Sequence, residues 1–155
     1  MPARHPVSLT DRPGFLIRRL HQTHQAIFAE ECAAFDITPV QFSIMTVAAA
    51  QPGLDQTALA HEVGVDRATL ANVLARLEGR GLVRRTPGRT DKRIKCVQLS
   101  AAGARTLARM DEAVTRAHWR TIKALPASRR DTFLEALRLL VDEGNEYSRA
   151  PLRLG

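Results

Sequence analysis

The side chains with the most informative chemistry are cations in the centre of the chain. Residues 91–99 read Asp-Lys-Arg-Ile-Lys-Cys-Val-Gln-Leu, so Lys92 and Arg93 lie in a turn-forming tip ahead of an alternating, strand-like run. Residues 81–86 predict a second short strand, and the loop between the two strands carries Arg89. A basic hairpin of this kind can reach the minor groove or the phosphates of DNA, because a narrow groove concentrates negative potential and attracts arginine.

A second polar group lies on the helix that the sequence predicts just before the hairpin. Asp66 can cap a helix over residues 67–79, whose apolar residues fall on one stripe that should be buried. The opposite face carries arginine, which can read guanine, and asparagine, which can read adenine. The DNA contacts predicted on this helix are Arg67, Thr69, Asn72 and Arg76. The alternative is that the two arginines are solvated, or paired with Asp66 and Glu78.

Two short helices and the hairpin form one unit. Asp55 can cap a helix over residues 56–63, and Gly64 supplies the turn that leads to the next helix. With the hairpin, residues 55–99 predict a winged helix-turn-helix, a device that reads DNA. On the first strand, Arg84 and its neighbour Arg85 face opposite sides. We assign a phosphate contact to Arg84 and keep Arg85 as the alternative.

Long amphipathic helices flank this unit. Apolar spacing and capping residues predict helices over 15–35, 39–50, 101–125 and 128–147. Their caps are Thr38 and Ser100, with Ser128 and Asp131 as a weaker pair before the last helix. The predicted fold class is mainly α with a small β-hairpin wing. We expect a flexible N-terminal arm at 1–12 and a single domain at 13–155, with dimerisation helices in 13–54 and 100–147.

The flanking helices have little to pack against within one chain. Their apolar faces would be covered by the same helices of a second copy, in a two-fold dimer. Such a dimer would hold two reading helices about 34–36 Å apart, the distance between adjacent major grooves. The alternative is a monomeric bundle in which the first and last helices pair with each other.

Composition excludes several other classes of protein. The formal charge of +7 and the sequence pI of about 10.6 suit a partner rich in phosphate. There is neither an apolar run of the roughly 20 residues that a membrane span needs nor an N-terminal secretory signal, so we expect a cytoplasmic protein.

Cys32 and Cys96 match no metal spacing and predict no disulfide framework. Neither a nucleophile–base pattern nor a phosphate loop is present, so we expect neither an enzyme nor a cofactor.

Several segments, in this order and spacing, resemble the MarR family of bacterial transcription regulators. They are Leu-Ala at 59–60, Arg-Ala-Thr-Leu at 67–70, Leu-Glu-Gly-Arg-Gly-Leu-Val-Arg-Arg at 77–85, Asp-Lys-Arg at 91–93 and Leu-Ser-Ala-Ala-Gly at 99–103. The resemblance extends from about residue 13 to 147, and residues 13–19 look like members that control the breakdown of aromatic acids. It implies a homodimer that binds a palindromic operator, usually to repress, and releases it when a small anionic or aromatic ligand binds.

The resemblance also implies roles for residues outside the reading helix. Asp91 would pair with a nearby arginine and orient the wing, although aspartate is also a common turn former. The ligand pocket would lie between the dimer helices and the reading unit. Its candidate residues are Arg18, His21, His24, Phe28 and Met45, with Ile17 beside them. The two histidines could instead be satisfied at the dimer interface, and two histidines alone are too few for a zinc site.

Two alternative functions compete with a ligand-responsive regulator. Some relatives in this family sense oxidants through a thiol, and Cys32 is the candidate here. The neighbouring Glu30 and Glu31 would raise the pKa of that thiol, so an inert, buried cysteine is favoured. A winged helix can also bind another protein, but that role would not require arginine at the wing tip. As effector we expect an aromatic acid, hydroxylated, N-heterocyclic or carried as a coenzyme A thioester.

Overall fold

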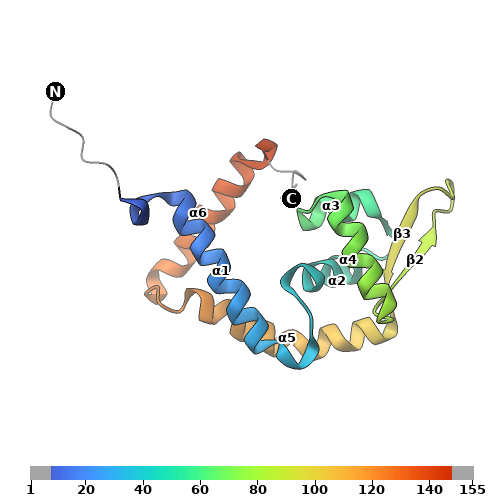
Figure 1. Ribbon diagram of the computed structural model, residues 1–155, viewed down its shortest axis with the longest axis horizontal. Coiled ribbons are helices and arrows are strands. Elements are labelled where there is room, and N and C mark those ends of the chain that lie inside the picture. Colours follow the sequence, from blue (N-terminus) through green and yellow to red (C-terminus); the bar gives the residue numbers. More distant parts are fainter. Residues whose placement is uncertain (1–7, 148–155) are drawn as a thin grey trace.

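The computed structural model describes residues 8–147, which form a mainly helical chain with one small three-stranded antiparallel sheet (Figure 1). In chain order the elements are the 3-10 turn Leu9–Asp11, α1 (Pro13–Glu31), the 3-10 turn Ala33–Phe35, α2 (Pro39–Ala50), β1 (Leu54–Asp55), α3 (Gln56–Val63), α4 (Arg67–Gly79), β2 (Val83–Pro87), β3 (Lys95–Leu99), α5 (Ala101–Ile122), α6 (Ala127–Glu143) and the 3-10 turn Asn145–Tyr147. The predicted fold class is confirmed. Residues 1–7 of the expected arm lie outside the described residues.

The helix starts follow from side-chain caps that the sequence predicts. Thr38 and Gln41 form a capping box at α2: the Gln41 N–H donates to Thr38 Oγ1 (3.2 Å) and the Thr38 N–H donates to Gln41 Oε1 (2.9 Å). At α3, α4 and α5 the cap is a single bond, in which the side chain of Asp55, Asp66 or Ser100 accepts from a backbone N–H of the first turn. These caps satisfy N–H groups that have no partner inside a helix.

The start of α6 is a correction. The predicted capping pair of Ser128 and Asp131 is wrong, because the residue before α6 is Pro126, and no side chain caps this helix. The Arg129 N–H already donates to the Pro126 carbonyl at 2.9 Å, so Ser128 falls inside the first turn.

Other boundaries also differ from the prediction. α1 ends at Glu31, earlier than expected, and gives way to the 3-10 turn Ala33–Phe35, a frequent ending for an α-helix. α5 ends at Ile122 rather than at residue 125. Strand β1 was not predicted, because two residues are too few to show alternation. It pairs with β3, with Leu54 opposite Val97, and gives the sheet order β1-β3-β2.

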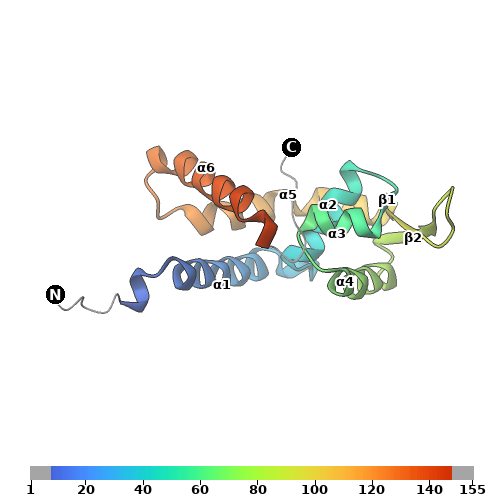
Figure 2. The same ribbon diagram turned by 90° about the horizontal axis from the view of Figure 1, so that it is seen from above.

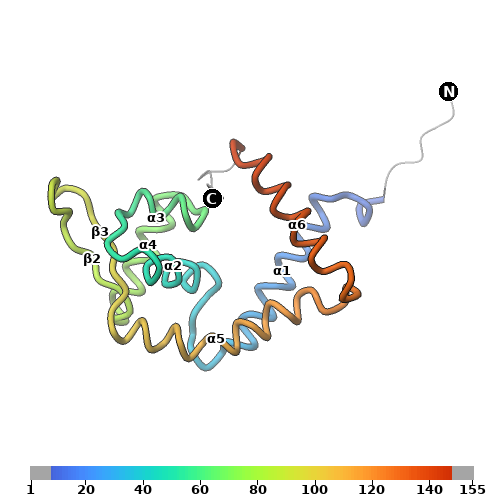
Figure 3. The backbone as a smooth tube through the Cα atoms, turned by 180° about the vertical axis from the view of Figure 1, so that it is seen from behind, coloured from blue at the N-terminus to red at the C-terminus, as the bar shows by residue number. Residues whose placement is uncertain are grey.

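The elements fall into two regions. The reading module is β1, α3, α4, β2 and β3, and the helical frame is α1, α5 and α6. In Figure 2, α6 lies above α1, and both are at the opposite end of the molecule from the hairpin β2–β3. Helix α5 passes from the end of β3 into the frame, where it packs along α1, and Figure 3 follows it from behind. Helix α2 lies between the regions and packs on α3, α5 and β3.

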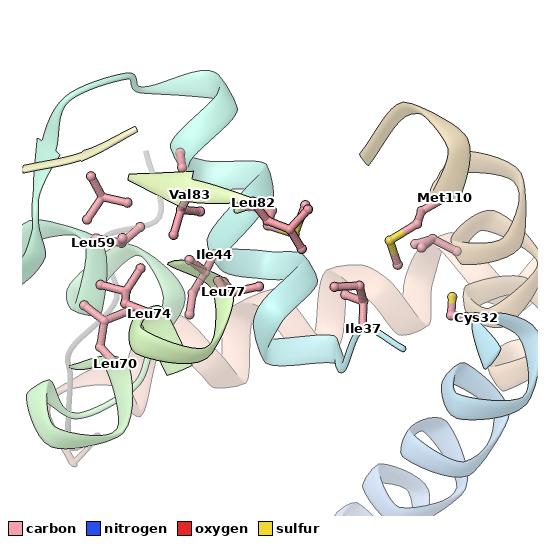
Figure 4. Close-up of a cluster of buried hydrophobic side chains, with 14 of the residues drawn as sticks. Cys32, Ile37, Ile44, Leu59, Leu70, Leu74, Leu77, Leu82, Val83 and Met110 are labelled. Carbon is pink, nitrogen blue, oxygen red and sulfur yellow. The ribbon is translucent and has the colours of Figure 1, made fainter. Parts of the chain in front are cut away.

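Buried apolar side chains hold both parts together. In the reading module, Leu59, Leu70, Leu74 and Leu77 of α3 and α4 are buried, together with Val83 of β2 (Figure 4). Nearer to the frame, Cys32, Ile37 and Met110 are also buried. The reading module is therefore anchored on a continuous hydrophobic core, which is what fixes α4 relative to the hairpin.

The junction between hairpin and frame depends on a close approach at Gly103. A Cβ atom at this position would lie 2.1 Å from the Leu82 carbonyl oxygen, so only glycine fits. Beside it, the Ser100 N–H donates to the same carbonyl and the Ser100 hydroxyl donates to the Gly81 carbonyl (2.6 Å). The start of α5 is thereby fixed to the first residues of the hairpin.

Ion pairs connect α1 to α5 within the frame. Arg116 Nε lies 2.9 Å from Glu31 Oε2, and Arg120 binds both Glu31 (2.8 Å) and Glu30 (2.6 Å). Hydrogen bonds from Arg116 and Arg120 hold the pKa of Glu31 below its ordinary value. This cluster fixes the C-terminal end of α1 against the C-terminal part of α5.

Candidate nucleic-acid interface and effector cavity

Helix α4 exposes the predicted reading residues because its apolar stripe packs into the core on the opposite side. Leu70, Leu74 and Leu77 are buried against α3 and β2, which leaves the other face open to solvent. Arg67, Asn72 and Arg76 are all exposed on this helix. Their donors and acceptors are available to base edges, as recognition in a major groove requires.

Thr69 is placed differently from the other candidates on α4. Its backbone N–H donates to Asp66 Oδ1 (2.7 Å) and its hydroxyl donates to Asp66 Oδ2 (3.0 Å). Both donors are therefore engaged by the cap of the helix, although the side chain is exposed. A phosphate contact by Thr69 would have to break the hydroxyl bond, so the cap is the role that the geometry favours.

Of the two carboxylates named above as alternative partners of the reading arginines, Glu78 is engaged by another residue. Glu78 binds Arg85, with Oε1 at 3.0 Å from Nη2 and Oε2 accepting from the Arg85 backbone N–H at 3.0 Å. The hydrogen bond from the Arg85 side chain holds the pKa of Glu78 below its ordinary value. Arg84 lies on the other side of β2, exposed. The structure thus engages Arg85 with Glu78, whereas Arg84 makes only a long hydrogen bond, from its Nη2 to Gln98 Oε1 (3.5 Å).

At the wing, Asp91 forms the ion pair that the family resemblance implies, and its partner is Arg93. Asp91 Oδ1 and Oδ2 each lie 3.1 Å from a guanidinium nitrogen of Arg93, and Oδ1 also accepts from the Arg93 backbone N–H (3.0 Å). These bonds hold the pKa of Asp91 below its ordinary value. The Arg93 side chain remains 92% exposed and keeps further N–H donors for a phosphate. Arg89 and Lys92 are exposed nearby.

A small polar cleft joins the wing to the reading helix. It has a volume of about 210 Å³ and is lined by Asp55, Gln56, Thr57, Arg67, Arg93, Ile94 and Lys95. The cleft brings the first residue of α4 and the wing arginine to one surface. The sequence prediction missed Gln56, Thr57 and Lys95, because nothing in the local pattern places the first turn of α3 beside the wing.

A larger and mostly apolar cavity lies in the helical frame. Its volume is about 590 Å³, and its lining residues are Ile17, Leu20, His21, His24, His118, Thr121, Ile122, Phe133, Leu134 and Leu137. His21, His24 and Ile17 line this one cavity, but it is formed by α1, α5 and α6 and does not lie between the frame and the reading module, where the family resemblance put it. The sequence prediction missed His118, which is 94 positions from His24 and reaches the cavity only because α5 packs along α1.

The other three pocket candidates do not line this cavity, which corrects the prediction that groups them there. Phe28 and Met45 are buried in the hydrophobic core, and Phe28 also lines a separate cavity of about 300 Å³ beside the turn between α1 and α2. The guanidinium of Arg18 lies over the ring of Phe15, 5.5 Å from its centroid. Their apolar or cationic character suited a pocket, but the register of α1 and the packing of α2 turn them elsewhere.

His24 is held in a defined state at the cavity wall. Its ring stacks on His118 at 5.2 Å, and its Nδ1 lies 2.9 Å from Thr121 Oγ1. Thr121 donates its own hydroxyl proton to the Ala117 carbonyl at 2.8 Å, so Nδ1 of His24 must be the donor and Nε2 is left as an acceptor. Burial, and then the charges of His118 and His21, lower the pKa of His24. His24 is therefore a neutral hydrogen-bonding group at neutral pH.

The thiol at Cys32 lies in the core, not in a reactive environment. It is buried, and burial together with the Glu31 carboxylate raises its pKa, against a smaller opposing effect of Arg116. A raised pKa disfavours the reactive thiolate. Among the described residues, no group of three or more histidine, cysteine, aspartate or glutamate side chains is placed to hold a metal ion. No helix within residues 8–147 is long and apolar enough to cross a membrane.

The fold and the exposed cations define a winged-helix DNA-binding protein. The MarR family model matches residues 37–95, and the transcriptional regulator HosA of Escherichia coli is 39% identical over 102 residues, which is 66% of this chain and 74% of HosA. The chain belongs to the MarR family of DNA-binding transcription regulators.

Two solved structures have the same architecture over most of their length. The transcriptional repressor CouR, bound to a 23-mer DNA duplex, superposes with a TM-score of 0.79 at 31% identity, covering 88% of this chain and 99% of CouR. BpsR of Bordetella bronchiseptica, whose DNA binding is regulated by 6-hydroxynicotinic acid, superposes with a TM-score of 0.84 at 25% identity, covering 89% of this chain and 99% of BpsR.

Proposed function

We propose that the protein is a homodimeric repressor that binds a palindromic operator and is released from it by a small aromatic acid. The observation that carries the DNA part is the pair of exposed cationic surfaces, α4 and the wing, joined at the polar cleft that Arg67 and Arg93 share. In this proposal Arg67, Asn72 and Arg76 read bases, while Arg84, Arg89, Lys92 and Arg93 hold phosphates or the minor groove. The repression of CouR's target, implied by its description as a repressor, supports the sign of regulation.

Apolar side chains on the frame support the homodimer. The large apolar residues exposed on α1 and α6 are Leu16, Ile17, Leu20, Leu134, Leu139, Leu140 and Val141. A monomer in water rarely leaves so many large apolar groups uncovered on adjacent helices. A second copy related by a two-fold axis would cover them with the same residues and would place two copies of α4 on one side of the assembly.

The frame cavity supports an aromatic effector. A volume of about 590 Å³ lies in the range of small-molecule sites and accommodates a substituted aromatic ring better than a coenzyme A thioester. Neutral His24 offers Nε2 as an acceptor, which suits a phenolic or ring hydroxyl group of the ligand. The acid that regulates DNA binding by BpsR carries both a hydroxyl and a carboxyl group on an aromatic ring, which supports this class of ligand.

The proposal is tested by selecting duplexes from a randomised pool with the wild-type protein and then challenging the selected complex. We expect an inverted repeat to be enriched, and 6-hydroxynicotinic or 4-hydroxybenzoic acid to release it, while benzoic acid, which lacks the hydroxyl group, acts more weakly. The variant His24→Gln should bind the same duplex and respond less. Enrichment of sites without inverted symmetry would contradict the palindromic dimer, and a complex indifferent to all of these acids would contradict the effector class.

A further inference from the structure

The elbow between α1 and α2, residues 32–38, joins the helical frame to the reading module. It consists of the 3-10 turn Ala33–Phe35 followed by Asp36, which has a left-handed backbone with φ +50°. The last carbonyl groups of a helical turn have no partner within that turn, and they need a donor from elsewhere. The elbow is therefore a bend whose geometry depends on groups outside it.

Arg80 supplies those donors from the end of the reading helix. Its Nη1 donates to the Asp36 carbonyl at 2.6 Å, and its Nη2 donates to the Phe35 carbonyl at 2.9 Å. Arg80 is the C-cap residue of α4, and its own backbone N–H donates to the Arg76 carbonyl. One planar guanidinium thus spans two successive carbonyls of the elbow and ties them to the helix that carries Arg76.

The elbow is also held from the frame and borders a cavity. The guanidinium of Arg109 on α5 lies 5.6 Å from the centroid of the Phe35 ring. On another side, Cys32, Asp36 and Ile37 contribute to the lining of a cavity of about 300 Å³, separate from the large cavity with the histidines. The same short segment therefore contacts α5, an open volume and the end of the reading helix.

We propose that Arg80 is a positioning residue for DNA reading, which fixes the angle of α4 to the helical frame and transmits movements of the elbow to the reading helix. The proposal rests on the proposed function, because it assumes that α4 reads DNA. A pair of reading helices can engage two half-sites together only if each helix is held at a fixed angle to the dimer helices. In this proposal Arg80 holds α4 at that angle through hydrogen bonds to two backbone carbonyls, 44 and 45 positions away in sequence, and not through a contact with DNA.

The choice of arginine provides a sharp test. A lysine keeps the charge but is a single point donor and cannot span two carbonyls in a plane. The matched control is Arg105, an exposed arginine of α5 that lies outside the elbow and outside the proposed DNA surfaces. Arg80→Lys should therefore be harmful where Arg105→Lys is not, although both variants keep the net charge and both positions are exposed.

The experiment measures binding of wild type, Arg80→Lys and Arg105→Lys to a duplex selected by the wild type and to a scrambled duplex. We expect Arg80→Lys to weaken selected-duplex binding about tenfold while leaving scrambled binding unchanged, a loss typical of a residue that acts on binding through its neighbours. Arg105→Lys should leave both affinities within about twofold, as is usual for an exposed position away from the binding surface. If Arg80→Lys behaves like Arg105→Lys, Arg80 has no positioning role.

Hydrogen exchange of the free proteins separates this proposal from the proposed function. Arg80→Lys should speed exchange of the amides in residues 33–38 and at the end of α4, while Arg105→Lys should not. Unchanged exchange in Arg80→Lys would overturn the clamp, whatever the DNA results. If the wild type selects no duplex, the proposed function fails, and the exchange experiment still decides whether Arg80 fixes the elbow.

Discussion

The reading module and the helical frame differ in how completely one chain builds them. In the reading module the large apolar side chains of α3 and α4 are buried, as Leu59 and Leu74 show with 0% exposure, and cations are exposed on α4 and at the wing. In the frame, Ile17 is 59% and Leu140 is 64% exposed. Because exposed apolar area on this scale is usually covered in stable assemblies, the comparison supports the proposal that the frame is half of a dimer interface, while one chain builds the core of the reading module by itself.

The largest expected effect lies in the core of the module. Leu74→Ala removes a fully buried side chain from α4 and should lower the free energy of unfolding by about 2–5 kcal/mol, through lost burial and the cavity left behind. Urea denaturation at several protein concentrations measures it. The loss should be present at every concentration. A loss below about 1 kcal/mol would show that α4 is less firmly packed than its burial indicates.

An arginine introduced on the apolar face of the frame should weaken self-association of the chain. Leu140→Arg, on the exposed apolar face of α6, should weaken self-association by about 100-fold or more, because an unpaired charge would be buried twice in a two-fold interface. Sedimentation velocity over a dilution series measures it. The control is Glu135→Arg, which introduces the same side chain at an exposed polar position of α6 and should leave the dimer intact. Equal behaviour of the two variants would contradict the proposed interface.

Within the module, the wing and the reading helix should fail in different ways. Arg93→Ala should weaken binding to selected and scrambled duplexes alike, because its contacts are expected on the DNA backbone or minor groove. Asn72→Ala should cost about 1–3 kcal/mol on the selected duplex and relax sequence choice at one position. Fluorescence anisotropy with both duplexes distinguishes them. Equal losses on both duplexes for both variants would remove the division of labour between wing and α4.

The smallest effect is a pH dependence of the frame. Burial and the neighbouring His118 and His21 lower the pKa of His24, so the unfolded chain takes up a proton first as the pH falls. Stability is therefore full above the ordinary histidine pKa of about 6.5 and declines as the pH falls through the lowered value. The melting temperature should fall between pH 7.5 and 5.5, and His24→Gln should reduce that fall. An unchanged pH profile in the variant would contradict the assigned role of His24.

Much of the reading module could be predicted from sequence because its determinants are local. The caps at Asp55 and Asp66 and the turn at Gly64 each depend on residues within one or two turns. The pairing of Asp91 with an arginine was implied by the family resemblance, and the contact is local too, since its partner Arg93 is two residues away. A local sequence pattern is sufficient wherever the deciding contact is local.

The roles that the sequence did not predict depend on contacts between residues that are distant in sequence. His118 reaches the cavity only through the packing of α5 on α1, and a surface pattern on one helix does not show its partner. Arg80 looks like an ordinary basic residue at a helix end, and its role depends on carbonyls that any sequence would supply. Phe28 and Met45 have the character of pocket residues, yet small differences in helix register placed them in the core.

The most direct test of the account is the stoichiometry of DNA binding, measured by sedimentation with a selected full-length duplex and with a duplex carrying only one half-site. If the module is complete in one chain but function needs the frame of two, the full duplex should bind two chains cooperatively, and the half-site duplex should bind far more weakly. Tight binding of a single chain to the half-site duplex, with no gain from the second half-site, would contradict the account.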